Sequence, residues 1–184
     1  MIQSLDIPEV KLITPKRFGD ARGYFSETWN KRTLSEAGLD IDFVQDNHSY
    51  SAAQGVLRGL HFQKPPHAQV KLVRCTRGSV YDVAVDIRVG SPTYGQYVGA
   101  ELSAENGVQI LVPEGFAHGF VTLEPDSELQ YKVTDYYAPD CDANIRWDDP
   151  SLGIDWKVDP AIITLSDKDQ VAPLLSEVDS GFVY

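Results

Sequence analysis

The stretch Leu57-Arg58-Gly59-Leu60-His61-Phe62-Gln63 lies at the centre of residues 47–81, a segment that holds no acidic residue. The chain as a whole is strongly acidic, with 27 Asp and Glu against 16 Lys and Arg and a net charge of −11. The stretch has the composition of a β-strand, and a second strand-like run, Val70-Lys71-Leu72-Val73, follows it. A strand-rich segment without acidic residues, in a protein that is otherwise acidic, is predicted to bind an anion. His61 would be the proton acceptor of such a site and Lys71 its cation.

Similar short runs separated by turn residues continue along the chain, with roughly 8–12 residues between turn signals, which is typical of a β-sandwich or barrel. Arg77-Gly78 lies between two of these runs and is predicted to form a hairpin turn. One helix is predicted near Thr33, because Thr33-Leu34-Ser35-Glu36 fits a capping box and Gly38 fits the helix end. A short helical turn is predicted from Ser166. The sequence therefore predicts a mainly β fold with a few short peripheral helices.

The length fits one domain spanning residues 1–184, with 42% hydrophobic and 23% charged residues. From about residue 139 the chain is rich in Asp, Pro and Trp, and we expect an irregular tail packed on the barrel. No apolar run approaches the roughly 20 residues of a membrane span, and the N-terminus lacks the features of a secretory signal. The two cysteines, Cys75 and Cys141, are too few for a disulfide framework, which favours reduced thiols in the cytoplasm.

The charge is unevenly distributed. Residues 1–77 hold 11 Lys and Arg against 8 Asp and Glu, whereas residues 78–184 hold 5 against 19. A nucleic-acid or anionic-membrane partner would need a broad basic surface, so neither is expected. A small anionic ligand held by a local basic cluster agrees with this distribution.

Side chains at positions i and i+2 of a strand share a face. Leu57, Gly59, His61 and Gln63 are therefore predicted to lie together, opposite Arg58, Leu60 and Phe62. If the faces that carry His61, Lys71 and Tyr131 line a barrel lumen, these side chains are polar groups on an apolar wall, as in a typical ligand site. The sequence by itself does not show that they converge.

Each candidate also has an ordinary structural explanation. A lone strand histidine such as His61 is more often structural than catalytic. Lys71 fits a strand-edge lysine, and Tyr131 fits a core or edge tyrosine. The remaining candidates fit local structure: Asp169 as the capping-box partner of Ser166, Arg22 in a turn, and Arg58 on a strand surface.

A metal site is not expected from the histidine spacing. Gln63 stands where a metal-binding cupin would place the second histidine of a His-x-His pair, and His67 follows Pro65-Pro66. The chain also lacks the glycine-rich dinucleotide fingerprint, the phosphate loop and the Gly-x-Ser-x-Gly elbow.

Six blocks run in order along nearly the whole chain: Gly19–Glu27, Phe43–Ser49, Val56–Gln63, Lys71–Cys75, Pro113–Thr122, and Leu165–Asp169 followed by Ala172–Leu175. Together they closely resemble the dTDP-4-dehydrorhamnose 3,5-epimerases, a cofactor-free family of isomerases among the cupin-like jelly rolls. The resemblance implies a double-stranded β-helix, or jelly-roll, barrel. It also implies a homodimer formed by strand exchange, no metal or organic cofactor, and conversion of dTDP-4-dehydro-6-deoxy-glucose to dTDP-4-dehydro-rhamnose.

The resemblance also assigns roles, position by position. His61 corresponds to the general base, Asp169 to its orienting carboxylate, Lys71 to the cation that stabilises the enolate, and Tyr131 to the general acid. A further set corresponds to the ligands of the nucleotide diphosphate: Arg22, Glu27, Gln45, Asn47, Arg58, His118 and Lys168. Asp142 is a further ligand candidate, at a position where some relatives carry Glu.

The implied chemistry agrees with these residue types. Epimerisation on either side of a C4 ketone needs a proton removed from one face and returned to the other, and the enolate formed in between needs a fixed cation. Three alternatives stay open. They are an epimerase acting at only one carbon of a related dTDP-keto-sugar, a metal-dependent cupin, and a non-catalytic module that binds sugar nucleotides.

Overall fold

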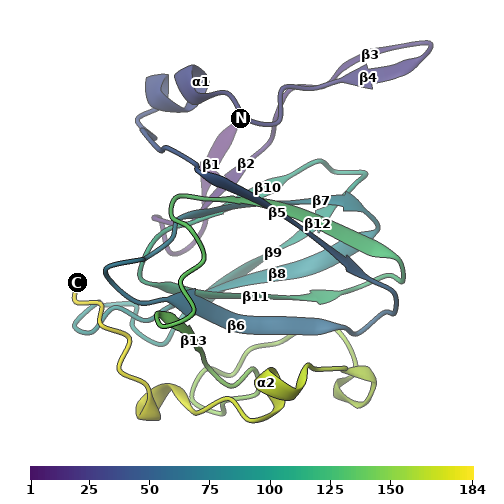
Figure 1. The fold of residues 1–184 in the computed structure, drawn as a ribbon. Coiled ribbons are helices and arrows are strands. Elements are labelled where there is room, and N and C mark those ends of the chain that lie inside the picture. Colours follow the sequence, from purple (N-terminus) through teal and green to yellow (C-terminus); the bar gives the residue numbers. More distant parts are fainter.

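Two antiparallel β-sheets face each other in the computed structural model, which describes residues 1–184 (Figure 1). The six-stranded sheet has the order β1 (Ile2–Ser4), β2 (Lys11–Ile13), β10 (Gln109–Val112), β7 (Lys71–Arg77), β12 (Ser127–Val133) and β5 (Gln45–Ser51). The five-stranded sheet has the order β13 (Asp142–Asn144), β6 (Leu57–Gln63), β11 (Phe116–Thr122), β8 (Ser79–Asp86) and β9 (Tyr97–Ser103). This mainly β architecture is the predicted jelly roll.

Four short helical segments and one hairpin lie outside the two sheets. The helices are α1 (Lys31–Glu36) and α2 (Asp167–Gln170), with 3-10 turns at Pro160–Ile162 and Leu175–Glu177. The hairpin pairs β3 (Phe18–Asp20) with β4 (Gly23–Phe25) and projects away from the sheets (Figure 1). None of the helices has both the length and the apolar character needed to cross a bilayer.

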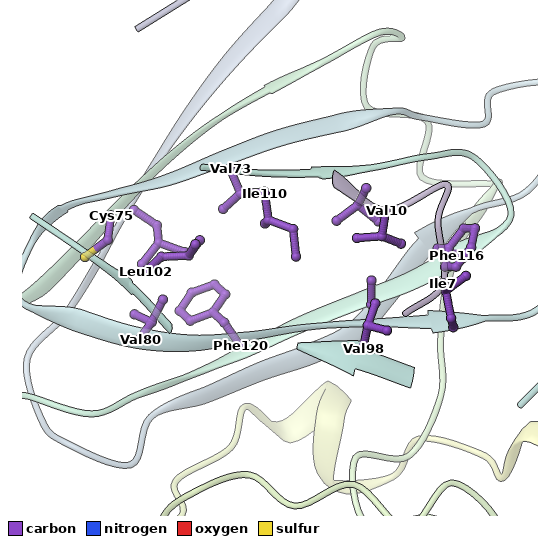
Figure 2. Packing of buried hydrophobic residues seen from close by; sticks show 13 residues of the cluster. Ile7, Val10, Val73, Cys75, Val80, Val98, Leu102, Ile110, Phe116 and Phe120 are labelled. Atoms are coloured by element: carbon purple, nitrogen blue, oxygen red, sulfur yellow. The ribbon is translucent and has the colours of Figure 1, made fainter. Parts of the chain in front are cut away.

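The main core fills one part of the space between the sheets. Its side chains come from β7, β10 and β12 on one side and from β8, β9 and β11 on the other, and Figure 2 shows them meeting between the two layers. Val73, Val80, Leu102 and Ile110 are fully buried there. Burial of this apolar surface is the main favourable contribution to folding. Because none of these residues comes from β5 or β6, the space between those two strands is left to other side chains.

A second core covers the outer face of the five-stranded sheet. Leu57, Leu60 and Phe62 of β6 pack there against residues that follow β13, including Ile145 and Trp156. In Figure 1 this last part of the chain, which includes α2, runs beneath the sheet. The strand β6 is therefore buried on one face by the C-terminal region and faces the interior of the barrel with the other.

Two local predictions were wrong. Arg77-Gly78 does not close a hairpin, because β7 belongs to the six-stranded sheet and β8 to the five-stranded sheet. Gly78, with φ +69°, instead turns the chain from one sheet into the other. The capping box at Thr33 is also wrong, since α1 begins at Lys31 and the side chain of Asn30 caps it by accepting from the Thr33 N–H.

The predicted alternation of β6 fails at Gly59. On the neighbouring strand β11, His118 pairs with His61 and Phe120 with Arg58, so β6 carries one extra residue between these two positions. This β-bulge resets the alternation. Leu57 therefore points to the outer core with Leu60, whereas Arg58 and His61 both line the interior.

Gly59 permits the bulge because it has no side chain. Its φ is +142°, and an added Cβ would lie 2.5 Å from the Cα of Gly119 on β11. We expect Gly59→Ala to lower the free energy of unfolding by about 2–4 kcal/mol, measured by urea denaturation. The matched control is Gly153→Ala, where φ is also positive but nothing lies within 4 Å of the added atom. An equal loss in both variants would contradict a steric role for Gly59.

Candidate active site

A hollow between the two sheets gathers most of the predicted site residues. Its volume is about 410 Å³, and its lining includes Arg58, His61, Lys71, His118, Tyr131 and Asp169. A second hollow, also of about 410 Å³, shares His61, Lys71 and Tyr131 with the first and continues towards Gln45, Asn47, Asp142 and Lys168. The site is therefore a two-lobed cavity, and the three shared side chains lie where the lobes meet.

His61 is paired with a buried carboxylate. Its Nε2 lies 2.6 Å from Oδ1 of Asp169, whose side chain is 3% exposed, whereas the His61 side chain is 32% exposed. Burial acts to raise the pKa of Asp169, but hydrogen bonds from His61, Ser166 and the Gly59 N–H outweigh it and lower the pKa. An ionised Asp169 accepts a hydrogen bond from Nε2–H of His61, which leaves Nδ1 as the ring nitrogen that does not contact Asp169.

The helical turn predicted at Ser166 positions this carboxylate. α2 begins after Ser166, whose Oγ accepts from the Asp169 N–H at 3.2 Å. Asn144 on β13 donates from Nδ2 to the carbonyl of Lys168 at 3.2 Å, and Asn144 pairs in register with His61. The turn that carries Asp169 is thus tied to the strand beside β6.

Lys71 is a buried cation at the start of β7. Its Nζ lies 3.4 Å from the carbonyl oxygen of His61. Burial lowers the pKa of Lys71 to about 8, although the carboxylates of Asp82 and Asp142 favour the charged form. An ammonium this poorly solvated gains much from a nearby negative charge, so Lys71 is suited to stabilise an anion that forms in the cavity.

Tyr131 reaches the cavity from the opposite sheet to His61. It lies on β12, where it pairs with Asn47 of β5 and Val73 of β7, while His61 lies on β6. Burial raises the pKa of Tyr131, and the nearby charge of Arg58 opposes that rise. The phenol is therefore held protonated, as a proton donor must be.

A second His–Asp pair lies beside the first. Nε2 of His118 is 2.9 and 3.0 Å from the two carboxylate oxygens of Asp82, and both side chains are buried. His118 pairs with His61 across β11 and β6, so the two imidazoles belong to neighbouring strands. The sequence analysis missed Asp82. Asp82 could have been identified from the sequence, because it is a charged residue inside the apolar run Ser79–Ile87 and a buried charge needs a partner.

Comparison with known proteins now identifies the family. A family model described as dTDP-4-dehydrorhamnose 3,5-epimerase matches residues 4–177. The chain belongs to the dTDP-4-dehydrorhamnose 3,5-epimerase family. It is 55% identical to the dTDP-4-dehydrorhamnose 3,5-epimerase of Sinorhizobium fredii over 99% of this chain and 93% of that protein.

Solved structures agree with this family of epimerases. A dTDP-6-deoxy-D-glucose-3,5-epimerase from Legionella pneumophila, in complex with dTDP-4-keto-L-rhamnose, is similar with a TM-score of 0.95 and 46% identity, over 100% of this chain and 98% of that one. A 3'-monoepimerase from Streptomyces bikiniensis, in complex with dTDP-quinovose, is similar with a TM-score of 0.86 and 34% identity, over 94% and 87%. The predicted family and fold are confirmed.

The second lobe of the cavity is lined by several of the residues predicted to bind the nucleotide diphosphate. Gln45 donates from Nε2 to Oδ1 of Asn47 at 2.8 Å, and Lys168 forms an ion pair with Asp142. The exposed Tyr137 lines the same lobe, and its hydroxyl is 3.4 Å from Asp142. The sequence analysis did not single out Tyr137, which has no neighbouring pattern that marks it as a ligand.

Arg22 and Glu27 lie apart from the epimerase cavity. Arg22 is in the turn of the β3–β4 hairpin, where its side chain is 90% exposed and bonded to Asp20. Glu27 follows β4 and lines a different cleft, between the hairpin, α1 and the edge of the six-stranded sheet. Within one chain, these two predicted ligands do not join the others. No three His, Cys, Asp or Glu side chains gather as a metal ion would require.

The buried Lys71 makes the stability of this protein depend on pH. Its folded-state pKa of about 8 lies below the ordinary 10.5, so the unfolded chain binds more protons between these values and stability rises with pH there. We expect Lys71→Met, which removes the buried charge, to unfold with a free energy up to about 3 kcal/mol higher than wild type near pH 7. The difference should shrink as the pH approaches 10.5. Denaturant titrations of both proteins over this range test it, and a constant difference would contradict it.

Proposed function

We propose that this chain epimerises dTDP-4-dehydro-6-deoxy-glucose at C3 and C5 to give dTDP-4-dehydro-rhamnose. The observation that carries the proposal is the pairing of His61 with Asp169 on one wall of the cavity, with Tyr131 on the opposite sheet and Lys71 where the lobes meet. Inversion at a carbon next to a ketone needs a base on one face and an acid on the other. A module that only bound sugar nucleotides would need no such pair.

The base in this mechanism is His61. With Nε2 donating to Asp169, the other ring nitrogen is free to take the proton from C3 or C5. The ionised carboxylate then stabilises the imidazolium that forms, and it holds the ring in one orientation during the transfer. Because Asp169 is buried and Ser166 caps its helix, little reorganisation accompanies the step.

Lys71 is the electrostatic stabiliser. Removing a proton beside the ketone places negative charge on the C4 oxygen, and this charge is larger in the transition state than in the bound substrate. A buried ammonium stabilises it more than a solvated one would. Tyr131, kept protonated by its buried position, returns a proton to the opposite face.

The ligands of the nucleotide diphosphate in this proposal lie in both lobes. Arg58 is anchored to Ser51 and to the Tyr50 carbonyl, which presents its guanidinium to the cavity. Gln45, Asn47, Asp142, His118 and Lys168 complete the set within the chain. We also propose that the reaction uses these side chains without a metal or organic cofactor. Both cysteines are free, which agrees with a cytoplasmic site of action.

The first test follows solvent deuterium into the sugar. Purified protein is incubated in D₂O with dTDP-4-dehydro-6-deoxy-glucose, and NMR is expected to show label at both C3 and C5. His61→Ala should lower the rate by about 10²–10⁴. The control is His67→Ala, whose imidazole bonds to Asp135 outside the cavity and whose removal should leave the rate unchanged.

Other outcomes of this assay would contradict the proposal in different ways. Label at one carbon only would indicate a single-carbon epimerase, such as the similar 3'-monoepimerase. An undiminished rate in His61→Ala would reject the assigned base. Activity that is lost with a chelator and restored by a metal ion would indicate a metal-dependent cupin.

We further propose that the chain works as a homodimer in which the β3–β4 hairpin reaches the partner's cavity. The hairpin projects from the body and exposes Phe18, Tyr24 and Phe25, whose side chains would be poorly placed in water (Figure 1). An exchanged hairpin would bury these rings. It would also bring Arg22 and Glu27 to a cavity that, within one chain, lacks both.

Mixing two inactive variants tests the exchange. In a mixed dimer of Arg22→Ala and His61→Ala, one cavity carries both defects and the other carries neither. Random mixing after unfolding and refolding together should therefore restore about a quarter of wild-type activity. Each variant refolded alone is the control. If Arg22 served its own chain, every cavity would keep one defect and the mixture would stay inactive.

A further inference from the structure

One polar side chain in the cavity wall has no partner. The Oγ of Ser49 is buried and makes no hydrogen bond, a condition it shares in the whole chain only with Nε1 of Trp29. Trp29 lines the cleft beneath the hairpin, whereas Ser49 lines the cavity that holds His61, Lys71 and Tyr131. Buried hydroxyls in folded proteins are nearly always hydrogen-bonded, so the unpaired Oγ of this cavity-lining residue is available to a ligand once it turns towards the cavity.

The neighbours of Ser49 are all engaged. The inner face of β5 presents Gln45, Asn47, Ser49 and Ser51 in turn, while Asp46, His48 and Tyr50 face outward. Gln45 bonds to Asn47, and Ser51 accepts from Nε of Arg58 at 3.3 Å. Ser49 is therefore the one member of this polar row that is free to bond to a ligand. Turning its hydroxyl towards a ligand would break no existing bond.

The position of Ser49 selects the part of the ligand. Ser49 pairs with Leu129 on β12, so it is a diagonal neighbour of Tyr131, two residues further along that strand. It lines the lobe that contains His61 and Asp169 as well as the proposed diphosphate ligands Arg58 and His118, so its place beside Tyr131 decides which part of the ligand it meets. In the proposed mechanism Tyr131 protonates a ring carbon of the hexose. A hydroxyl beside Tyr131 is therefore close to the hexose rather than to the nucleoside.

We propose that Ser49 is a specificity-determining residue whose hydroxyl hydrogen-bonds to an oxygen of the substrate's hexose. This assignment rests on the proposed function, because it takes a nucleotide-linked hexose as the ligand of the cavity. A hydroxyl that pairs only with the sugar discriminates against ligands that lack the matching oxygen, since it is then left unpaired in the wall. Ser49 thus selects the sugar without taking part in proton transfer.

The test compares two ligands in wild type and Ser49→Ala by calorimetry. One ligand is dTDP, which has no hexose, and the other is dTDP-glucose, which has a hexose but no ketone and so is not turned over. We expect the variant to bind dTDP as wild type does and to bind dTDP-glucose about tenfold more weakly. The thermal midpoint without ligand should not fall, because the substitution breaks no hydrogen bond. His48→Ala, which faces outward on the same strand, should change neither affinity.

Four other results would overturn the assignment. An equal loss for both ligands would place the Ser49 contact on the nucleotide diphosphate. Unchanged affinity for both ligands, or a lower thermal midpoint, would make Ser49 a purely structural residue. Wild-type protein that binds neither ligand would overturn the proposed function and this assignment together, and it would do so before any substitution is made.

Discussion

The close approach of two backbones at Gly59 and Gly119 is the constraint on which the rest of the site depends. Only an extra residue in β6 at this point lets Arg58 and His61 face the same cavity while Leu57, Leu60 and Phe62 face the outer core. A regular strand would have turned either His61 or Arg58 away from the cavity. The same seven residues therefore supply a wall of the site and the anchor for the C-terminal region. The local irregularity makes both possible.

Burial has a different effect on each polar side chain of the cavity. It lowers the pKa of Lys71 and raises that of Tyr131, whereas the bonds around Asp169 keep that carboxyl ionised despite its burial. Burial thus leaves Lys71 poorly solvated and Tyr131 protonated, while Asp169 stays ionised beside His61. The apolar core that excludes water from the barrel thus sets the chemistry of the few polar groups left inside it.

The sequence predicted the fold class and most of the residues of the cavity, but not the geometry that joins them. His61, Lys71 and Tyr131 were proposed from the residue types on three strand-like runs, and the jelly roll brings those strands together. The bulge at Gly59 could not be read from the pattern, because alternation assumes a regular strand and the glycine needed by the bulge also fits a turn. The hairpin predicted at Arg77-Gly78 was wrong. The sequence of a glycine turn is the same whether the next strand pairs in the same sheet or crosses to the other sheet. Asp82 was passed over because its partner, His118, lies 36 residues away in the chain.

The pairing of His61 with Asp169 joins positions 108 residues apart. The chain leaves the ribosome from its N-terminus, so the strands of the barrel emerge long before α2 does. The orientation of His61 therefore depends on the docking of a segment that is made after the strands of the barrel.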